Sequence, residues 1–235
     1  MYKHNRIRNM KKIFVLLTFI TTISFAQEQK KSFNLKDFDK IDLGSSFVIT
    51  VTQGNSYKVD VRGREQDVKE IIAKVSNGTL DLHYPSNWSG WRNRKEVYVN
   101  ITMPKLTGAE FSGASKSTVS GFSSEKLNID VSGASSAVFN VDAKNLSLDC
   151  SGASSLKIIG AGQSLNAEAS GASSVNAYDF KVSTANIDAS GASDAKLYVT
   201  SKINAEASGA SSVRYKGGAS VKSNTSGAGS VKSVN

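Results

Sequence analysis

Acidic residues recur at one fixed position of a repeat in the second half of the chain. The tripeptide Ser-Gly-Ala returns every 18 to 20 residues. If each repeat forms one coil of a stack, the acids two positions before its serine form a column spaced ~4.8 Å apart. We call this column the acidic ladder; its members are Glu110, Asp130, Asp149, Glu168, Asp188 and Glu206. Like charges at this spacing repel by about 1 kcal/mol per neighbouring pair in water, so cations, a partner surface, or solvent and salt must compensate them.

The acidic ladder suggests three kinds of chemistry. The simplest interpretation is a solvated polar face, with Asp130, Asp149, Glu168, Asp188 and Glu206 as an outward candidate binding surface. A row of carboxylates also suits Ca²⁺, although the chain lacks the Gly-Gly-x-Gly-x-Asp nonapeptide of calcium-binding β-rolls. Polysaccharide cleavage needs an asymmetric pair of acids, whereas here every coil carries the same acid at the same place. We therefore predict no catalytic residue, no metal site and no cofactor.

Basic residues occupy a second column, six positions after the serine. Lys157, Lys196, Arg214 and Lys232 stand there. In a stack of coils this column lies across a corner from the acidic ladder.

A polar loop in the first half of the chain carries both tryptophans. Trp88 and Trp91 stand close to Arg92 and Arg94. Exposed aromatic rings on a loop can stack on a sugar ring or on a protein partner. The loop could equally fold back and cap the stack, so both interpretations stay open.

The repeats themselves predict the fold. Positions one, three and five before each serine are mostly apolar and the positions between them are polar, which indicates one half-buried strand per coil. A second alternating strand follows each Ser-Gly-Ala-Ser, whose glycine can take a positive φ at the corner. Residues 112–235 are thus expected to form an all-β, right-handed parallel β-helix with coils of ~19 residues.

Residues 33–111 lack the tripeptide but read as strands. Alternating segments at 46–51, 57–61, 79–84 and 96–101 are rich in β-branched and aromatic residues. One short helix is expected over 65–74. We expect this β-rich part to pack as a cap or as the first coils of the β-helix.

The first 26 residues have the features of a signal peptide. A basic segment precedes the apolar run from Ile13 to Phe25, which is too short to span a bilayer comfortably, and Ala26 offers a cleavage site. Translation could start at Met1 or at Met10. We therefore expect an exported mature chain without a transmembrane segment.

Charge and cysteine content narrow the classes of function. The leader carries five of the 29 basic residues and none of the 20 acidic ones, so the formal charge falls from +9 to +4, which gives little support for nucleic-acid binding. The single cysteine, Cys150, excludes an internal disulfide and is expected to be a small buried hydrophobic residue. His83 is the only histidine after the leader, so no Cys-His or Ser-His site is expected in the stack.

Taken together, three segments resemble a known family. They are residues 32–54 (from Ser-Phe-Asn-Leu-Lys to Thr-Gln-Gly), Ile101-Thr-Met-Pro-Lys-Leu106, and the run of Ser-Gly-Ala-Ser repeats. This combination resembles the DUF2807 family, also called the putative auto-transporter adhesin, head GIN domain. The resemblance covers nearly all of the mature chain. It implies an exported bacterial protein with a β-helix-like fold of two packed parts, and it supplies no catalytic residues.

The sequence therefore favours a non-enzymatic, exported β-helix protein that binds or adheres at the cell envelope. Its partner would be an envelope component, glycan or protein, and its location periplasmic, cell-surface or secreted. A structural scaffold without a ligand is the alternative, and a carbohydrate-active enzyme is a third.

Overall fold

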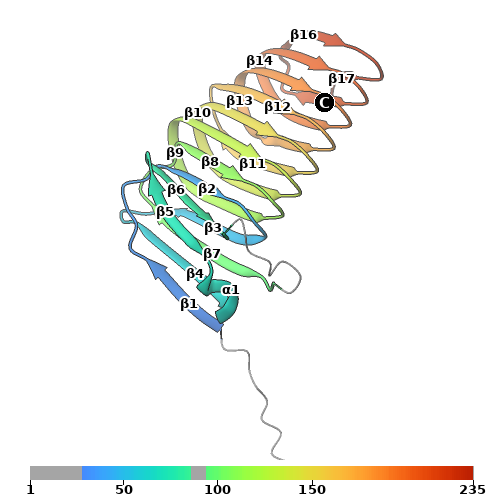
Figure 1. The fold of residues 1–235 in the computed structure, drawn as a ribbon. Coiled ribbons are helices and arrows are strands. Elements are labelled where there is room, and N and C mark those ends of the chain that lie inside the picture. Colours follow the sequence, from blue (N-terminus) through green and yellow to red (C-terminus); the bar gives the residue numbers. More distant parts are fainter. Residues whose placement is uncertain (1–27, 86–93, 235) are drawn as a thin grey trace, which may run out of the picture.

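The fold is a β-solenoid of about 7 turns with ~19-residue coils. The computed structural model describes residues 28–85 and 94–234. It is nearly all β, with 67% strand and 3% helix, and its coils stack side by side along one axis (Figure 1). The fold class expected from the repeats is confirmed.

The described residues form seventeen strands and one short helix. They are β1 (Glu28–Phe33), β2 (Lys40–Leu43), β3 (Phe47–Gln53), β4 (Lys58–Arg64), α1 (Glu65–Lys69), β5 (Ile72–Ser76), β6 (Thr79–His83), β7 (Val97–Met103), β8 (Gly108–Phe111), β9 (Lys116–Val131), β10 (Ser136–Cys150), β11 (Ser155–Ala161), β12 (Ser164–Ala169), β13 (Ser174–Ala189), β14 (Asp194–Ala207), β15 (Ser212–Lys216), β16 (Ser220–Thr225) and β17 (Ser230–Ser233).

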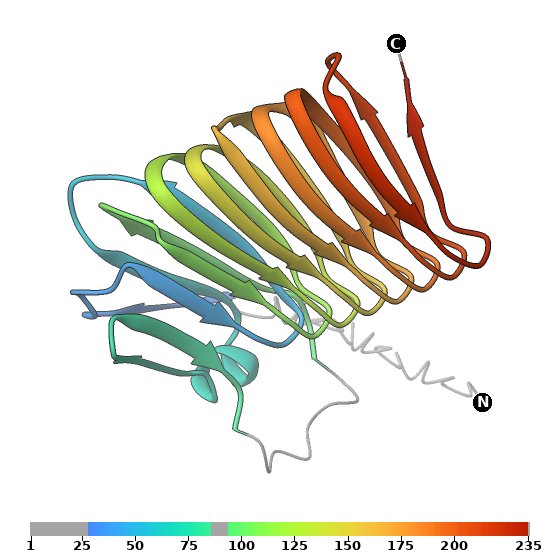
Figure 2. The ribbon, with the colours of Figure 1, turned by 90° about the horizontal axis from the view of Figure 1, so that it is seen from above.

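Each coil contributes to two long faces of the solenoid, which Figure 2 shows as the two sides of the flattened loops. The first face contains β2, β6, β8, β12, β16 and the C-terminal halves of β9, β10, β13 and β14. The second face contains β3, β7, β11, β15, β17 and the N-terminal halves of the same four strands. Every pairing between successive coils is parallel, so side chains at equivalent positions stand in register.

The backbone geometry of the Ser-Gly-Ala-Ser corner requires glycine at its second position. Gly171 has φ +72°, and a Cβ placed on it would lie 2.6 Å from the carbonyl oxygen of Gly152 in the preceding coil. The next amide, that of Ala172, donates a hydrogen bond of 2.8 Å to the same oxygen. Only glycine satisfies both demands at no steric cost.

The fourth residue of the corner is a buried serine. In two coils its hydroxyl donates to a backbone carbonyl: that of Ser193 to the Ala169 oxygen (3.0 Å), and that of Ser211 to the Ala189 oxygen (2.8 Å), whereas the buried Ser173 hydroxyl has no hydrogen bond in the described structure. Most buried hydroxyls have such an acceptor. The serine is therefore a structural part of the corner.

Apolar side chains from both faces fill the interior. Phe111 and Phe139 lie in successive coils with ring centroids 6.0 Å apart, and both are fully buried. Cys150 is also fully buried, and burial raises the pKa of its thiol to about 11. The expectation of a buried, unreactive cysteine agrees with this environment.

The N-terminal part supplies both coils and an end cap. β2 pairs in parallel with β8, and β3 pairs in parallel with β9, so this coil lies directly against the first Ser-Gly-Ala coil. Its corner is Gly44-Ser45-Ser46, and Ser45 has φ +87° where the later corners have glycine. Beyond it, β1, β4 and β5 join by antiparallel pairing.

The helix expected over 65–74 is shorter than predicted. α1 ends at Lys69, and β5 begins at Ile72 and pairs with β6. Asn77 (φ +50°) and Gly78 (φ +73°) make the tight hairpin turn between β5 and β6. Pairing with β6 thus overrides the apolar spacing that suggested a longer helix. The four strands expected in this part are confirmed as β3, β4, β6 and β7, with bounds within a few residues.

Within the described residues, no helix is long and apolar enough to cross a membrane. At the C-terminal end of the stack, every residue of β16 is exposed. Val221 occupies a position that is buried in earlier coils, yet it is 47% exposed.

Candidate functional site

The acidic ladder lies on the outer surface of the first face, and its members stand in register from coil to coil. Asp130 pairs with Asp149, Asp149 with Glu168, Glu168 with Asp188, and Asp188 with Glu206. At the other end, Glu110 pairs with Asp130. The structure therefore brings together the carboxylates that the sequence spacing selected.

The column of carboxylates is longer than the sequence repeat indicated. Asp42 in β2 pairs with Glu110 in β8, and Asp81 in β6 pairs with Asp42. We call the acidic ladder with Asp42 and Asp81 added the extended ladder. Asp42 stands two residues before the corner Gly44, the same offset as in the repeats, and this was the signal that could have identified it.

Most carboxylates of the extended ladder form no ion pair with the described residues. Among the members of the extended ladder, only Asp81 takes part in such a pair, with Lys74 (3.3 Å) and with His83. Acids elsewhere on the surface are commonly paired, for example Asp179 with Lys157 (3.2 Å). The extended ladder from Asp42 to Glu206 is therefore a stretch of uncompensated negative charge.

Burial and mutual repulsion act on the N-terminal half of the extended ladder. Burial raises the pKa of Asp42, Glu110 and Asp130 above the usual values, and neighbouring carboxylates raise each pKa further. The neighbours are Asp81 for Asp42, Asp42 and Asp130 for Glu110, and Asp149 and Asp42 for Asp130. These carboxyl groups thus hold protons more tightly in the folded state than in the unfolded chain.

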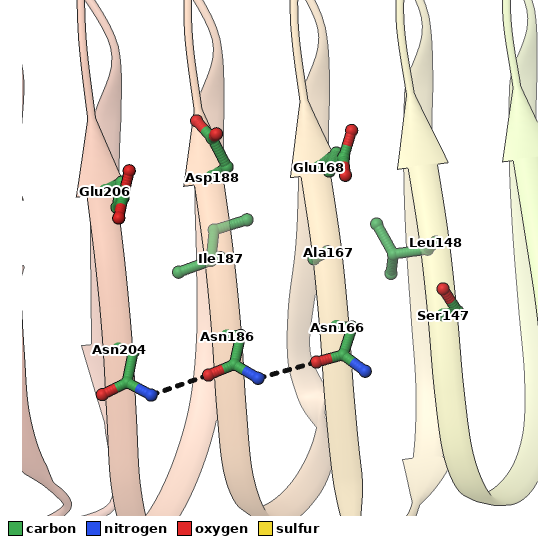
Figure 3. Close-up of a pocket in the computed structure, with 10 residues that line it drawn as sticks. All are labelled: Ser147, Leu148, Asn166, Ala167, Glu168, Asn186, Ile187, Asp188, Asn204 and Glu206. Atoms are coloured by element: carbon green, nitrogen blue, oxygen red, sulfur yellow. Dashed lines mark hydrogen bonds between the residues drawn. The ribbon is translucent and has the colours of Figure 1, made fainter.

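A second column on the same face carries amides. Asn204 donates to Asn186 and Asn186 donates to Asn166, each through the side chains at 2.8 Å. Figure 3 shows this amide ladder running parallel to Glu206, Asp188 and Glu168. Each amide fixes its neighbour, so this wall is more rigid than a row of free side chains.

A shallow groove runs between the two columns. Leu148, Ala167 and Ile187 line its floor between Asn and acid positions, and the hollow measures about 430 Å³. A second hollow of about 640 Å³ continues towards the N-terminal coils around Glu110 and Gly108, where the glycine removes one side chain from the amide wall. The groove follows the solenoid axis, so its carboxylate wall repeats in every coil, while the other wall varies along the axis and includes glycine, serine and asparagine.

No His or Cys is among the described residues that line the groove. Among residues 28–85 and 94–234, no group of three His, Cys, Asp or Glu side chains is placed to hold a metal ion. His83 contacts Asp81 at one end of the extended ladder, and the Cys150 thiol is buried with a raised pKa. The carboxylates stand at equivalent strand positions in a row, so a ligand that follows the row meets the same kind of group at each coil.

The basic column lies on the second face and is partly neutralised. Lys157, Lys196, Arg214 and Lys232 stand at equivalent strand positions there. Lys157 pairs with Asp179, while Lys196 (3.5 Å) and Arg214 (3.0 Å) share Asp194. This column therefore does not mirror the extended ladder.

The tryptophan loop lies largely outside the described residues. Trp88, Trp91 and Arg92 fall within the segment 86–93, of which no structure is described. Arg94 is described, and its guanidinium lies 3.5 Å from the ring centroid of Tyr84 in the N-terminal cap. Arg94 thus contributes to the packing of the cap, and the loop's role in binding remains a prediction.

Comparisons with known proteins agree on the fold. A putative adhesin from Bacteroides fragilis has a TM-score of 0.80 at 24% identity, over 88% of this chain and 94% of that one. A putative adhesin from Parabacteroides distasonis has a TM-score of 0.73 at 19% identity, over 89% and 98%. A putative lipid binding protein from the same species has a TM-score of 0.65 at 16% identity, over 88% and 97%. The search of curated proteins gives no match.

A match to a family model identifies the family of the chain, whereas the structural neighbours show only the fold. The model described as putative auto-transporter adhesin, head GIN domain matches residues 37–219, which include the solenoid from β3 to β15 and the whole acidic ladder. The match covers far more than half of the chain. The chain therefore belongs to this family, DUF2807.

Proposed function

We propose that the protein is an exported, non-enzymatic binding module of the bacterial cell envelope, and that the groove beside the extended ladder binds an extended cationic ligand. The family and the structural neighbours carry the name adhesin, which supports an adhesin-like binding role. The basic and apolar segments at the start of the chain support export.

The observation that carries this proposal is the uncompensated charge of the extended ladder. From Asp42 to Glu206 the carboxylates stand about one coil apart. Each adjacent pair costs about 1 kcal/mol in water at ~4.8 Å. A ligand that places positive charge along this column removes the repulsion and therefore gains affinity from it.

The shape of the groove favours a linear ligand. One wall has a carboxylate in every coil, and the other has the linked amides of Asn166, Asn186 and Asn204 in three successive coils. A polymer lying along the axis meets a carboxylate at each step and an amide over three coils, so weak contacts add up through repetition. Amino groups would pair with the carboxylates, and hydroxyl or carbonyl groups would bond with the amides. An amino-sugar glycan or a basic protein segment of the envelope has this chemistry.

The test uses a matched pair of ligands. The purified protein is titrated calorimetrically with hexameric β-1,4-glucosamine, which carries free amines, and with its fully N-acetylated counterpart, which does not. We expect heat only with the free amine, and weaker binding at high salt because exposed charges are screened. Equal binding of both hexamers would contradict a charge-based site.

Variants assign the binding to the groove. The triple variant Asp149→Asn, Glu168→Gln, Asp188→Asn should weaken binding at least about tenfold, or about 1.4 kcal/mol. The control Glu125→Gln, Asp179→Asn removes acids that pair with Lys144 and Lys157 elsewhere and should leave binding unchanged.

Two alternatives have distinct outcomes in the same samples. A structural scaffold would show no heat with the glucosamine hexamer, with basic peptides or with envelope extracts. A carbohydrate-active enzyme would release new reducing ends from a glycan on prolonged incubation, which the uniform row of acids does not favour.

A further inference from the structure

A cluster of tyrosines and lysines lies on the second face, away from the acidic groove. Tyr198 in β14 pairs with Lys216 in the next coil and with Lys181 in the preceding one. Tyr178 joins them from β13, where the register shifts between Ala177 and Lys181. Such a bulge changes the direction of a side chain in an otherwise regular stack. We call Tyr178, Tyr198, Lys181 and Lys216 the tyrosine–lysine cluster.

The cluster holds its cations against aromatic rings. The ammonium of Lys216 lies 4.9 Å from the ring centroid of Tyr198 and 5.3 Å from that of Tyr178. The ammonium of Lys181 lies 5.9 Å from the Tyr198 centroid. Neither lysine forms an ion pair within the described chain. The carboxylates of the neighbouring strands are already engaged, Asp179 with Lys157 and Asp194 with Arg214 and Lys196.

A small hollow opens beside the cluster. It measures about 290 Å³ and is lined by Tyr198, Lys216, Gly217, Gly218, Ser233 and Val234. A Cβ on Gly217 would lie 2.7 Å from two carbons of the Tyr198 ring, whereas nothing lies within 4 Å of a Cβ on Gly218. Gly217 thus lets the ring lie against the backbone, and the space beside Gly218 stays open.

From this geometry we propose that the tyrosine–lysine cluster binds an anionic saccharide through a uronic acid residue. Neither ammonium group is paired with a carboxylate of residues 28–85 or 94–234, so both can bind the carboxylate of the sugar. The tyrosine rings offer apolar surface for the C–H face of a sugar ring, and their hydroxyls, with that of Ser233, offer hydrogen bonds. Aromatic rings and unpaired cations side by side match a ligand that is both flat and negatively charged.

This surface differs in charge from the groove beside the extended ladder. An anionic glycan is repelled by the carboxylates of the first face and attracted to the cations of the second. The two faces therefore accept ligands of opposite charge, and the inference does not depend on what the acidic groove binds.

The test again uses a matched pair of ligands. The purified protein is titrated with hexagalacturonate and with its methyl ester, which keeps the sugar rings but removes the charge. We expect measurable binding of hexagalacturonate and at least tenfold weaker binding of the ester. The single variants Lys216→Gln and Tyr178→Ala should each weaken hexagalacturonate binding at least fivefold.

Control variants distinguish a loss of ligand binding from a loss of folding. Lys157→Gln removes a cation of the same face that already has a partner and should change affinity less than twofold. Thermal melting of each variant checks folding, and Lys181→Gln, at an exposed position, tests the cluster without removing the Lys216 contact. The proposal is overturned if the ester binds as well as the acid, if hexagalacturonate gives no heat, or if Lys181→Gln and Lys216→Gln bind as the unchanged protein does.

Discussion

Replacing Asp130 with asparagine removes one charge from the extended ladder and should stabilise the fold. Asp130 stands in register with Glu110 on one side and with Asp149 on the other. At ~4.8 Å each pair costs about 0.9 kcal/mol in water. A Debye length of about 8 Å at physiological salt reduces the two pairs together to about 1 kcal/mol. For a chain of this size the melting temperature should rise by about 2–4 °C.

The assay is thermal and urea unfolding of Asp130→Asn and the unchanged protein at several salt concentrations and pH values. The stabilisation should be largest at low salt and small at 1 M, where the Debye length is about 3 Å. The pKa of Asp130 is raised in the folded state. Below its unfolded pKa the carboxyl group is protonated in both states and does not lower the free energy of unfolding. As the pH rises through its folded pKa the group ionises, and its charge then destabilises the folded state. The advantage of asparagine should thus be present at pH 7 and absent below about pH 4.

A matched control lies on the second face. Asp179→Asn removes a carboxylate that pairs with Lys157 at 3.2 Å, and loss of a surface ion pair should lower stability by about 0–1 kcal/mol. If Asp130→Asn lowers stability at low salt, or raises it by the same amount at every salt concentration, repulsion along the extended ladder is not the cause and the reasoning fails.

Three further predictions concern the solenoid itself. Gly171→Ala should lower the free energy of unfolding by at least about 2 kcal/mol, because alanine disfavours φ +72° and its Cβ would meet the Gly152 oxygen at 2.6 Å; Ala172→Ser, at the exposed neighbouring position, should be nearly neutral in the same urea titration. Ser45→Gly should raise the melting temperature, with a gain of about 0.5–1 kcal/mol, because Ser45 has φ +87°; an unchanged or lower melting temperature would contradict the strain assigned to it. The thiol of Cys150 should stay unmodified by a thiol reagent at pH 8 until the protein unfolds, because it is buried with a pKa of about 11; rapid labelling of the folded protein would show that the core opens.

The repeats could be predicted because most corners of the solenoid need the same four residues. Ser-Gly-Ala-Ser provides a positive φ at glycine, a small exposed residue and a buried hydroxyl. The spacing of this tetrapeptide in the sequence therefore gives the length of a coil. The corner of the first coil could not be located from the tripeptide, because Ser45 takes the glycine conformation there and Phe47 replaces the buried serine. The corner persists in space although its tripeptide is gone, since parallel pairing with β9 holds it in place.

Two members of the extended ladder could not be predicted from the repeat either. Asp42 and Asp81 enter the column only because β2 lies between β6 and β8, and these strands are far apart in sequence. The prediction of a helix up to residue 74 was wrong because of tertiary pairing as well. The segment from Ile72 forms a hairpin with β6 instead. The tyrosine–lysine cluster likewise depends on a bulge in β13, and the repeat pattern of the sequence does not predict this bulge.

The supply of cations does not explain why the extended ladder is uncompensated. The chain carries 29 Lys and Arg against 20 Asp and Glu, and lysines pair with acids in the cap and on the second face. In the neighbouring column of the first face, lysine stands only at Lys40 and Lys222. The positions between them hold glycine in β8 and asparagine or serine in β9, β10, β12, β13 and β14. A single lysine in that column would relieve two carboxylates at once. The repulsion is therefore tolerated along the whole groove, as expected of a surface whose positive charge comes from a bound ligand.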